Sequence, residues 1–316
     1  MSKISIIIAT CNRFESLKKT LDSLLIQDYS EAFSHDIIVV DNNSTDDTKA
    51  VIDSYKHKFP GQTLLYMFEG RQGKSFALNT AIAKAKGDII VFIDDDVILY
   101  KDWLQKIHDF TQSYDFDAAT GRIVPRYPPD VPSWVKENID LLSGPIVSYD
   151  YGEEVKEYDG KTMNPLVGAN MIVKRHLFDE AGLFDTNLGP GAGTFGDDTE
   201  ISIRWGKRNK RLYYVGTAAV WHPVTKDRMT LKYIARWNMA FGRYCVVKDK
   251  GAINKSLVCY GGTPRYLFRS IFGHIIKLIG TCFNKRKLLD HWVSLFRDIG
   301  SAKTYREYYL SQAKRA

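Results

Sequence analysis

Cysteine is scarce in this chain of 316 residues. The four cysteines, at positions 11, 245, 259 and 282, include no pair with C-x-x-C spacing. Structural zinc sites and redox-active dithiols use such closely spaced pairs. The cysteine pattern therefore speaks against a zinc site and fits a reducing compartment.

Long hydrophobic runs are also missing. The apolar run at the start of the sequence ends before Asn12 and is too short for a signal peptide or a membrane anchor. The longest apolar stretch near the end, residues 270–283, is interrupted by His274 and Lys277 and is too short to cross a bilayer. We therefore expect a cytoplasmic protein that contacts a membrane, if at all, peripherally at its cytoplasmic face.

Acidic residues are few in the last part of the chain. Residues 225–316 contain 19 Lys and Arg against 5 Asp and Glu, whereas the remainder contains 25 basic and 32 acidic residues. A basic segment on an acidic body favours an anionic partner such as a membrane surface, a nucleic acid or an anionic polymer. We predict a domain at 1–224 and a basic, aromatic-rich helical region at 225–316. Because no RNA-binding motif is visible, we expect no nucleic-acid partner.

The first hundred residues alternate between short apolar runs and segments with helical spacing. The apolar runs at 4–9, 36–41, 63–68 and 88–94 predict four strands. Ser44 and Asp47 have the spacing of a capping box for the second helix, and Gly87 is expected to close the third. Apolar strands joined by helices predict an α/β fold with a mostly parallel sheet.

Polar clusters follow three of these strands, at residues 10–13, 41–43 and 94–96. Ligands of such sheets bind at the carboxyl ends of the strands. The sequence therefore predicts one binding site, built from three strand ends.

The most unusual cluster is the run Asp94, Asp95 and Asp96. Adjacent carboxylates repel one another and are costly to desolvate. Strand alternation would place Asp94 and Asp96 on one side and Asp95 on the other, and such a D-x-D pair suits Mg²⁺ or Mn²⁺ together with phosphate. The alternative is a helix N-cap, although a cap needs only one aspartate.

Five segments in order carry a family resemblance over about residues 3–224: SIIIATCNRFESLKKTLDSLLIQ, IIVVDNNSTDDT, GKSFALNTAIAKAKGDIIVFIDDD, VGANMIVKR and GDDTEISIRW. Together they resemble a family 2 glycosyltransferase with the Rossmann-like GT-A fold. The resemblance implies a metal-dependent, inverting transfer of a sugar from a nucleoside diphosphate to an acceptor hydroxyl.

The resemblance also implies roles for individual residues. The nucleotide pocket would be lined by Ala9, Thr10 and Arg13, and Asp41 would accept a hydrogen bond from a uracil-like base, which makes a UDP-sugar the expected donor. The other implied substrate-binding residues are Lys74 near the phosphates, Asn79, Asp94 at the ribose, Asp95, Asp197 and Trp221. Asp96 and His222 would hold Mn²⁺ or Mg²⁺, and Asp198 would be the catalytic base. Asp197 stands where the family usually has Glu.

Several of these roles have a structural alternative. Lys74 could be a solvated surface lysine, and Asn79 could pack its helix. Asp197 or Asp198 could cap the following helix, with Arg204 as an internal ion pair. His222 could be structural and Trp221 part of the core.

The basic region allows two interpretations. One apolar helical face is predicted from Leu267, Ile271, Ile275 and Leu278, flanked by Arg265, Arg269 and Lys277. This profile is typical of an interfacial helix on anionic lipid. The alternative is a helical hairpin packed on the protein with a solvated basic face.

We therefore expect a glycosyltransferase that acts on a glycan or lipid-linked glycan in surface polysaccharide synthesis. The alternatives are a polyprenyl-phosphate sugar synthase, whose ionised acceptor needs no base, and a non-catalytic nucleotide-sugar-binding module. A dehydrogenase is disfavoured because the glycine-rich stretch at 189–196 lies far from the first strand.

Overall fold

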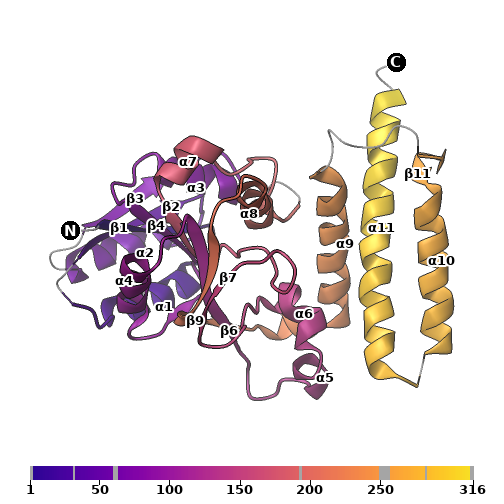
Figure 1. Ribbon diagram of the computed structural model, residues 1–316, viewed down its shortest axis with the longest axis horizontal. Coiled ribbons are helices and arrows are strands. Elements are labelled where there is room, and N and C mark those ends of the chain that lie inside the picture. The colour runs from indigo at the N-terminus through magenta and orange to yellow at the C-terminus, as the bar shows by residue number, and fades with distance from the viewer. Residues whose placement is uncertain are drawn as a thin grey trace. The chain divides into compact units, whose positions relative to one another are not determined.

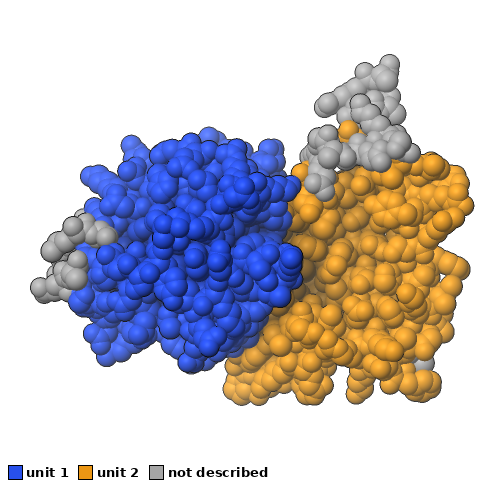
Figure 2. Space-filling model, viewed as in Figure 1, with its two compact units in different colours: residues 1–126, 147–192, 197–223 blue, residues 127–146, 193–196, 224–316 orange. Residues whose placement is uncertain are grey.

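The computed structural model describes residues 3–30, 33–59, 63–191, 194–248, 257–281 and 283–313. The chain divides into two compact units, coloured blue and orange in Figure 2. Unit 1 comprises 1–126, 147–192 and 197–223, and unit 2 comprises 127–146, 193–196 and 224–316. The predicted domains, with a boundary after residue 224, stay a prediction. The compact units break within one residue of that boundary but also place 127–146 and 193–196 with the C-terminal part.

Unit 1 is built on a nine-stranded mixed sheet with the order β3-β2-β1-β4-β8-β6-β9-β5, in which β7 pairs with β9. The strands are β1 (Lys3–Thr10), β2 (Ser34–Asp41), β3 (Thr63–Phe68), β4 (Ile89–Asp94), β5 (Ile98–Leu99), β6 (Ala118–Arg126), β7 (Val155–Glu157), β8 (Asn170–Lys174) and β9 (Leu212–Pro223). Strands β1 to β4 are parallel, as predicted, whereas β8 runs antiparallel to both β4 and β6.

Helices cover both faces of this sheet (Figure 1). One core contains buried side chains of α1 (Phe14–Leu25), α2 (Thr48–Tyr55) and α4 (Trp103–Ser113). The other contains those of α3 (Lys74–Ile82), α7 (His176–Ala181) and α8 (Asp197–Lys207). The central strands contribute alternate residues to the two cores, so they are apolar on both faces.

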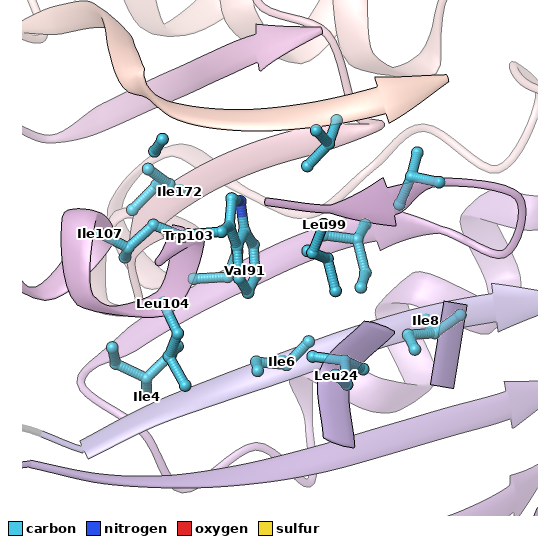
Figure 3. Close-up of a cluster of buried hydrophobic side chains, with 14 of the residues drawn as sticks. Ile4, Ile6, Ile8, Leu24, Val91, Leu99, Trp103, Leu104, Ile107 and Ile172 are labelled. Carbon is cyan, nitrogen blue, oxygen red and sulfur yellow. The ribbon is translucent and has the colours of Figure 1, made fainter. Parts of the chain in front are cut away.

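Figure 3 shows the first of these cores in detail. Ile4, Ile6 and Ile8 of β1 face the same side as Val91 of β4, and α4 closes over them with Trp103. The indole nitrogen of Trp103 donates to the Asn170 side chain at 2.9 Å, which satisfies its polar atom inside the core. This packing fixes β4, the strand that carries the aspartate run.

Unit 2 is helical. Its elements are α5 (Ser133–Lys136), α6 (Ile139–Ile146), η2 (Lys226–Met229), α9 (Leu231–Val247), the short strands β10 (Cys259–Tyr260) and β11 (Thr263–Pro264), α10 (Arg265–Gly280) and α11 (Lys285–Ala313). Helix α11 contacts both α9 and α10 and lies between them (Figure 1). Among the described helices, none combines the length and the apolar character that crossing a bilayer requires.

Glycine allows α9 and α11 to approach closely. A Cβ atom on Gly242 would lie 1.9 Å from the carbonyl oxygen of Arg297, and one on Gly300 would lie 2.0 Å from that of Met239. The Ser301 hydroxyl donates to the Gly242 carbonyl at 3.0 Å across the same crossing. The two helices therefore pack backbone against backbone.

Two local predictions were wrong. Helix α2 begins at Thr48, and its first turn is held by Asp46, which accepts from the Thr48 amide at 3.1 Å, while the Ser44 hydroxyl accepts from Asn12 instead. Helix α3 ends at Ile82, well before Gly87. Gly87 is required because a Cβ there would lie 2.5 Å from the Ser5 amide nitrogen of β1.

Candidate active site

The three predicted strand ends meet at one edge of the sheet. The register of the parallel strands places Thr10 opposite Asp41 and Ala9 opposite Asp94. The residues before these pairs, Ile8, Val40 and Ile93, are apolar and buried, so the register cannot slip without exposing the core. The predicted convergence of polar groups is therefore built into the sheet.

The aspartate run is held by two cations. Arg13 bridges Asp95 and Asp96: one of its terminal nitrogens lies 2.8 Å from the Asp95 carboxylate and the other lies 2.8 Å from the Asp96 carboxylate. The Thr10 hydroxyl donates to the second oxygen of Asp95 at 2.7 Å. Lys74 pairs with Asp94 at 2.5 Å. The charge repulsion within the run is therefore partly offset by the protein itself.

The predicted alternation within the run is wrong. Asp95 and Asp96 share one guanidinium, whereas Asp94 faces Lys74. The reason is that β4 ends at Asp94, so the period of two does not continue past it. Burial raises the pKa of Asp95 to about 6, although Arg13 acts in the opposite direction.

Lys74 connects the aspartate run with the start of α8. Its backbone amide donates to the Pro190 carbonyl at 2.9 Å, which ties α3 to the glycine-rich loop. Burial lowers its pKa, but the charges of Asp94, Asp197 and Asp198 outweigh burial and hold the pKa above its ordinary value. Lys74 is thus a charged, paired group, and the surface-lysine alternative does not fit its contacts.

The two acidic residues that open α8 differ in environment. Asp198 is half-buried, and its carboxylate accepts from the backbone amides of Gly168 at 2.9 Å and Thr199 at 2.7 Å. Asp197 is buried beneath Gly189, where a Cβ would lie 2.9 Å from the carboxyl carbon. Burial and repulsion by Asp198 raise the pKa of Asp197. Only Asp198 is both oriented and partly accessible.

The expected ion pair of Arg204 forms with a different partner. Arg204 pairs with Glu200 at 2.9 Å, one helical turn away, and donates to backbone carbonyls at the end of α7. It therefore neutralises neither Asp197 nor Asp198.

His222 and Asp96 face each other. Strand β9 places the His222 ring nitrogen Nε2 3.5 Å from Asp96 Oδ1. The His222 side chain is 1% exposed, and neither ring nitrogen has a hydrogen-bond partner among the described residues. A buried imidazole beside a carboxylate fits a divalent cation, for which both groups are ligands. No set of three or more acidic, histidine or cysteine side chains that could hold a metal occurs in the described part of the chain. Mg²⁺ in proteins commonly binds one or two carboxylates together with waters and substrate phosphates.

Three other predicted site residues have structural contacts. Asp41 is buried and accepts from the Ser44 amide at 2.9 Å and the Tyr66 hydroxyl at 3.1 Å. The Asn79 amide exchanges two hydrogen bonds with the backbone of Phe184, so its contacts match the packing alternative. Trp221 stacks on Tyr100 with ring centroids 5.1 Å apart and remains half-buried.

Comparison with known proteins places the chain in a family. The profile of glycosyl transferase family 2 matches residues 5–182. The chain belongs to glycosyl transferase family 2. The predicted family and the predicted class of enzyme are therefore confirmed.

Individual relatives are distant. The chain is 28% identical over 192 residues to the glucosyl-dolichyl phosphate glucuronosyltransferase of Haloferax volcanii, covering 59% of this chain and 57% of that protein. It is 24% identical over 240 residues to the succinoglycan biosynthesis protein ExoM of Rhizobium meliloti, covering 76% of this chain and 73% of that protein. The chain thus spans a little over half the length of the first relative and about three quarters of the second.

The fold of this family 2 member is shared with solved structures. A mannosyltransferase from Pyrobaculum calidifontis, solved with GDP-mannose and Mn²⁺, superposes with a TM-score of 0.56 at 20% identity, covering 99% of this chain and 79% of that one. At this identity the comparison carries the fold alone, and it confirms the predicted GT-A fold.

Sequence reasoning placed Asn42 in the polar cluster 41–43 but gave it no role, and the structure shows that it joins the end of β2 to the segment before α3. Asn42 is buried; its amide donates to the carbonyls of Glu69 and Arg71 and accepts from the Gly73 amide at 2.8 Å. Hydrogen bonds from Arg71 lower the pKa of Glu69 to about 2. The only signal in the sequence was the position of Asn42 directly after Asp41.

Two long connecting segments, 126–165 and 189–196, are described to different extents. In the first, 126–165, β7 pairs with β9, so this segment is neither a hairpin of its own nor wholly irregular. In the second, 189–196, residues 192 and 193 lie outside the described residues. A Cβ on Gly191 would lie 2.8 Å from the Gly73 Cα, which explains the glycine there.

Proposed function

We propose that this protein is a metal-dependent, inverting glycosyltransferase that moves a sugar from a nucleoside diphosphate, by preference UDP, to a hydroxyl of a glycan or lipid-linked glycan. The observation that carries the proposal is the buried His222 ring 3.5 Å from Asp96, at the sheet edge where Asp41 also lies. The names of the relatives, which refer to glucosyl-dolichyl phosphate and to succinoglycan, fit an acceptor of this kind.

In the proposed site Asp96 and His222 would hold Mn²⁺ or Mg²⁺, which would neutralise negative charge on the departing diphosphate. Ala9, Thr10, Asp41 and Asp94 surround the nucleoside. Arg13 and Lys74 set the charge of the aspartate run, and Asp95 holds Arg13 in place.

Asp198 acts as the base. Its carboxylate, fixed by the amides of Gly168 and Thr199, takes the proton from the acceptor hydroxyl as that oxygen bonds to the anomeric carbon. The bond from the anomeric carbon to the diphosphate breaks in the same step, and the diphosphate leaves with the electron pair. A single displacement of this kind inverts the anomeric centre.

We place the reaction at the cytoplasmic side of the membrane. The described cysteines Cys11 and Cys259 are not in disulfides, which fits a reducing compartment. Peripheral membrane contact is part of this proposal.

The first test is nucleotide binding followed by thermal unfolding. UDP and UDP-sugars should raise the melting temperature of the wild type only with Mn²⁺ or Mg²⁺, because a ligand that binds the native state stabilises it by mass action. Asp96→Ala should lose this effect, and Asp28→Asn, at a side chain 74% exposed, should keep it. Stabilisation of Asp96→Ala equal to that of the wild type would contradict the proposal, and a larger shift with GDP-sugars would replace UDP by GDP.

The second test separates the reaction from binding. Asp198→Asn should keep the metal-dependent shift and lose about 10²–10⁴-fold in the rate of transfer, the usual contribution of a general base. If the variant keeps full activity, the acceptor is already ionised, as in a polyprenyl-phosphate sugar synthase. If the wild type binds donor but transfers nothing to any acceptor, the chain is a binding module.

A further inference from the structure

Helix α10 has apolar side chains on two sides, and only one of them is covered. Leu267 is 3% exposed, on the side where α10 contacts α11. On the same side His274 lies 3.8 Å from Asp298 of α11. The predicted hairpin packing is therefore present, but it uses only part of the apolar surface of α10.

The uncovered side chains form an apolar stripe, which we define as Phe268, Phe272, Ile275, Ile276 and Ile279. These five side chains are between 43% and 74% exposed. Their spacing repeats every three or four residues, so they lie along one side of the helix over about 16 Å of its length. Phe283, just after the helix, is also fully exposed. Contiguous apolar surface of this kind marks an interaction site.

Basic residues border the apolar stripe, and no acidic residue interrupts it. Between positions 265 and 289 the chain has six basic residues and no Asp or Glu. Arg265, Arg269 and Lys277 lie on α10 itself and are exposed. Of the remaining three, only Arg286 has a carboxylate partner described, Asp140. The apolar stripe is therefore bordered by positive charges that no acidic residue of α10 neutralises.

This combination selects among possible partners. A second copy of the chain docked through the apolar stripe would bring two basic borders together without compensation. A nucleic acid would neutralise the charge but leave three isoleucines against phosphate. An anionic bilayer satisfies both features, because acyl chains accept the apolar side chains while headgroups meet the basic ones.

We propose that α10 is an interfacial helix that docks the protein on an anionic membrane surface. The apolar stripe lies at the boundary between headgroups and acyl chains, with Arg265, Arg269 and Lys277 at the level of the headgroups. This inference does not depend on the proposed reaction, although a lipid-linked acceptor would be held at the same surface.

Flotation of the full chain with vesicles tests the proposal. The wild type should bind vesicles of phosphatidylcholine with 30% phosphatidylglycerol and should bind phosphatidylcholine alone at least tenfold more weakly. The triple variant Arg265→Gln, Arg269→Gln, Lys277→Gln should lose about 100-fold in partitioning onto the anionic vesicles, since each basic residue near the surface contributes. Lys101→Gln, at a side chain 74% exposed in unit 1, is the matched control and should bind as the wild type does.

A second variant tests the apolar contact. Phe272→Ser, Ile276→Ser, Ile279→Ser should abolish binding to the anionic vesicles, whereas Leu231→Ser, at an exposed leucine of α9, should not. The melting temperature and the metal-dependent nucleotide shift should match the wild type in every variant, which separates this test from that of the proposed reaction.

Three outcomes would overturn the proposal. The first is that the wild type does not bind anionic vesicles at low salt. The second is that both triple variants bind these vesicles as well as the wild type does. The third is that light scattering shows a wild-type dimer that the serine variant converts to a monomer, because a second copy then covers the apolar stripe.

Discussion

Three consecutive aspartates persist at the end of β4 because two cations reach them from elsewhere in the chain. Arg13 comes from the turn after β1, and Lys74 comes from the start of α3. The aspartate run itself could be predicted from the sequence, since its position after an apolar strand is a local feature. The pairing could not, because Arg13 is 82 positions from Asp95 and the choice of partner depends on where β4 ends.

His222 illustrates the same limit. A lone histidine late in the chain carries no local signal that separates a ligand from a core residue. The structure adds a buried ring facing Asp96 at 3.5 Å, and this contact arises because β5, two residues after Asp96, pairs with β9 and places Ile98 opposite Trp221.

The environment of Asp197 leads to a prediction about stability and pH. Its pKa is raised from 3.8 to about 6, so the native state keeps the proton over a range in which the unfolded chain has lost it. The native state then binds more protons, and the free energy of unfolding falls as pH rises from about 4 to about 6. Asp197→Asn removes this loss. Without metal or nucleotide, the variant should gain up to about 2 kcal/mol relative to the wild type between pH 4 and pH 7.

Urea unfolding at several pH values measures this difference. Asp28→Asn, at an exposed carboxylate, is the control and should show a constant difference from the wild type across the same range. If the difference in unfolding free energy between Asp197→Asn and the wild type is also constant with pH, the native state does not disfavour the ionised form of Asp197.

At the scale of the elements, the order and type of the first four strands and three helices followed from periodicity. The length of α3 and the start of α2 did not, because close approach to β1 and a nearer carboxylate decided them. The crossing of α9 and α11 was also invisible in the sequence. Gly242 and Gly300 lie 58 positions apart, and neither differs locally from any other glycine in a helix.

This crossing predicts opposite effects for two similar substitutions. Gly300→Ala should destabilise the protein by about 1–3 kcal/mol, because its Cβ would lie 2.0 Å from the Met239 carbonyl oxygen and the helices would have to separate. Gly273→Ala in α10 should stabilise it by about 0.5–1 kcal/mol, because a Cβ there meets nothing within 4 Å and alanine is the better helix former. Denaturant midpoints of the two variants check this, and a shift of the same sign in both would argue against the crossing.

At the scale of the whole molecule, charge composition placed a boundary after residue 224. Packing adds what composition lacks. Val135, Leu142 and Ile146 of α5 and α6 form one buried cluster with Val224, Met229, Ile234, Leu289 and Val293. Residues 127–146, which lie within the acidic part of the sequence, therefore contribute to the core of unit 2, which also contains the basic region. Net charge is a property of a continuous stretch of sequence. It cannot reveal this cluster, because the cluster joins segments about 150 positions apart.

The cluster predicts that the fragment 1–224 is not an independent domain. Removing the later helices would uncover Val135, Leu142 and Ile146, each 0% exposed in the full chain. The fragment should therefore bind more of a hydrophobic dye than the full chain does, and it should aggregate under conditions in which the full chain stays in solution. Serine at all three positions should restore solubility to the fragment, because it removes the uncovered apolar surface without touching the sheet of unit 1. A fragment that stays monomeric, binds no dye and melts at the temperature of the full chain would show instead that the boundary after residue 224 separates two independently stable domains.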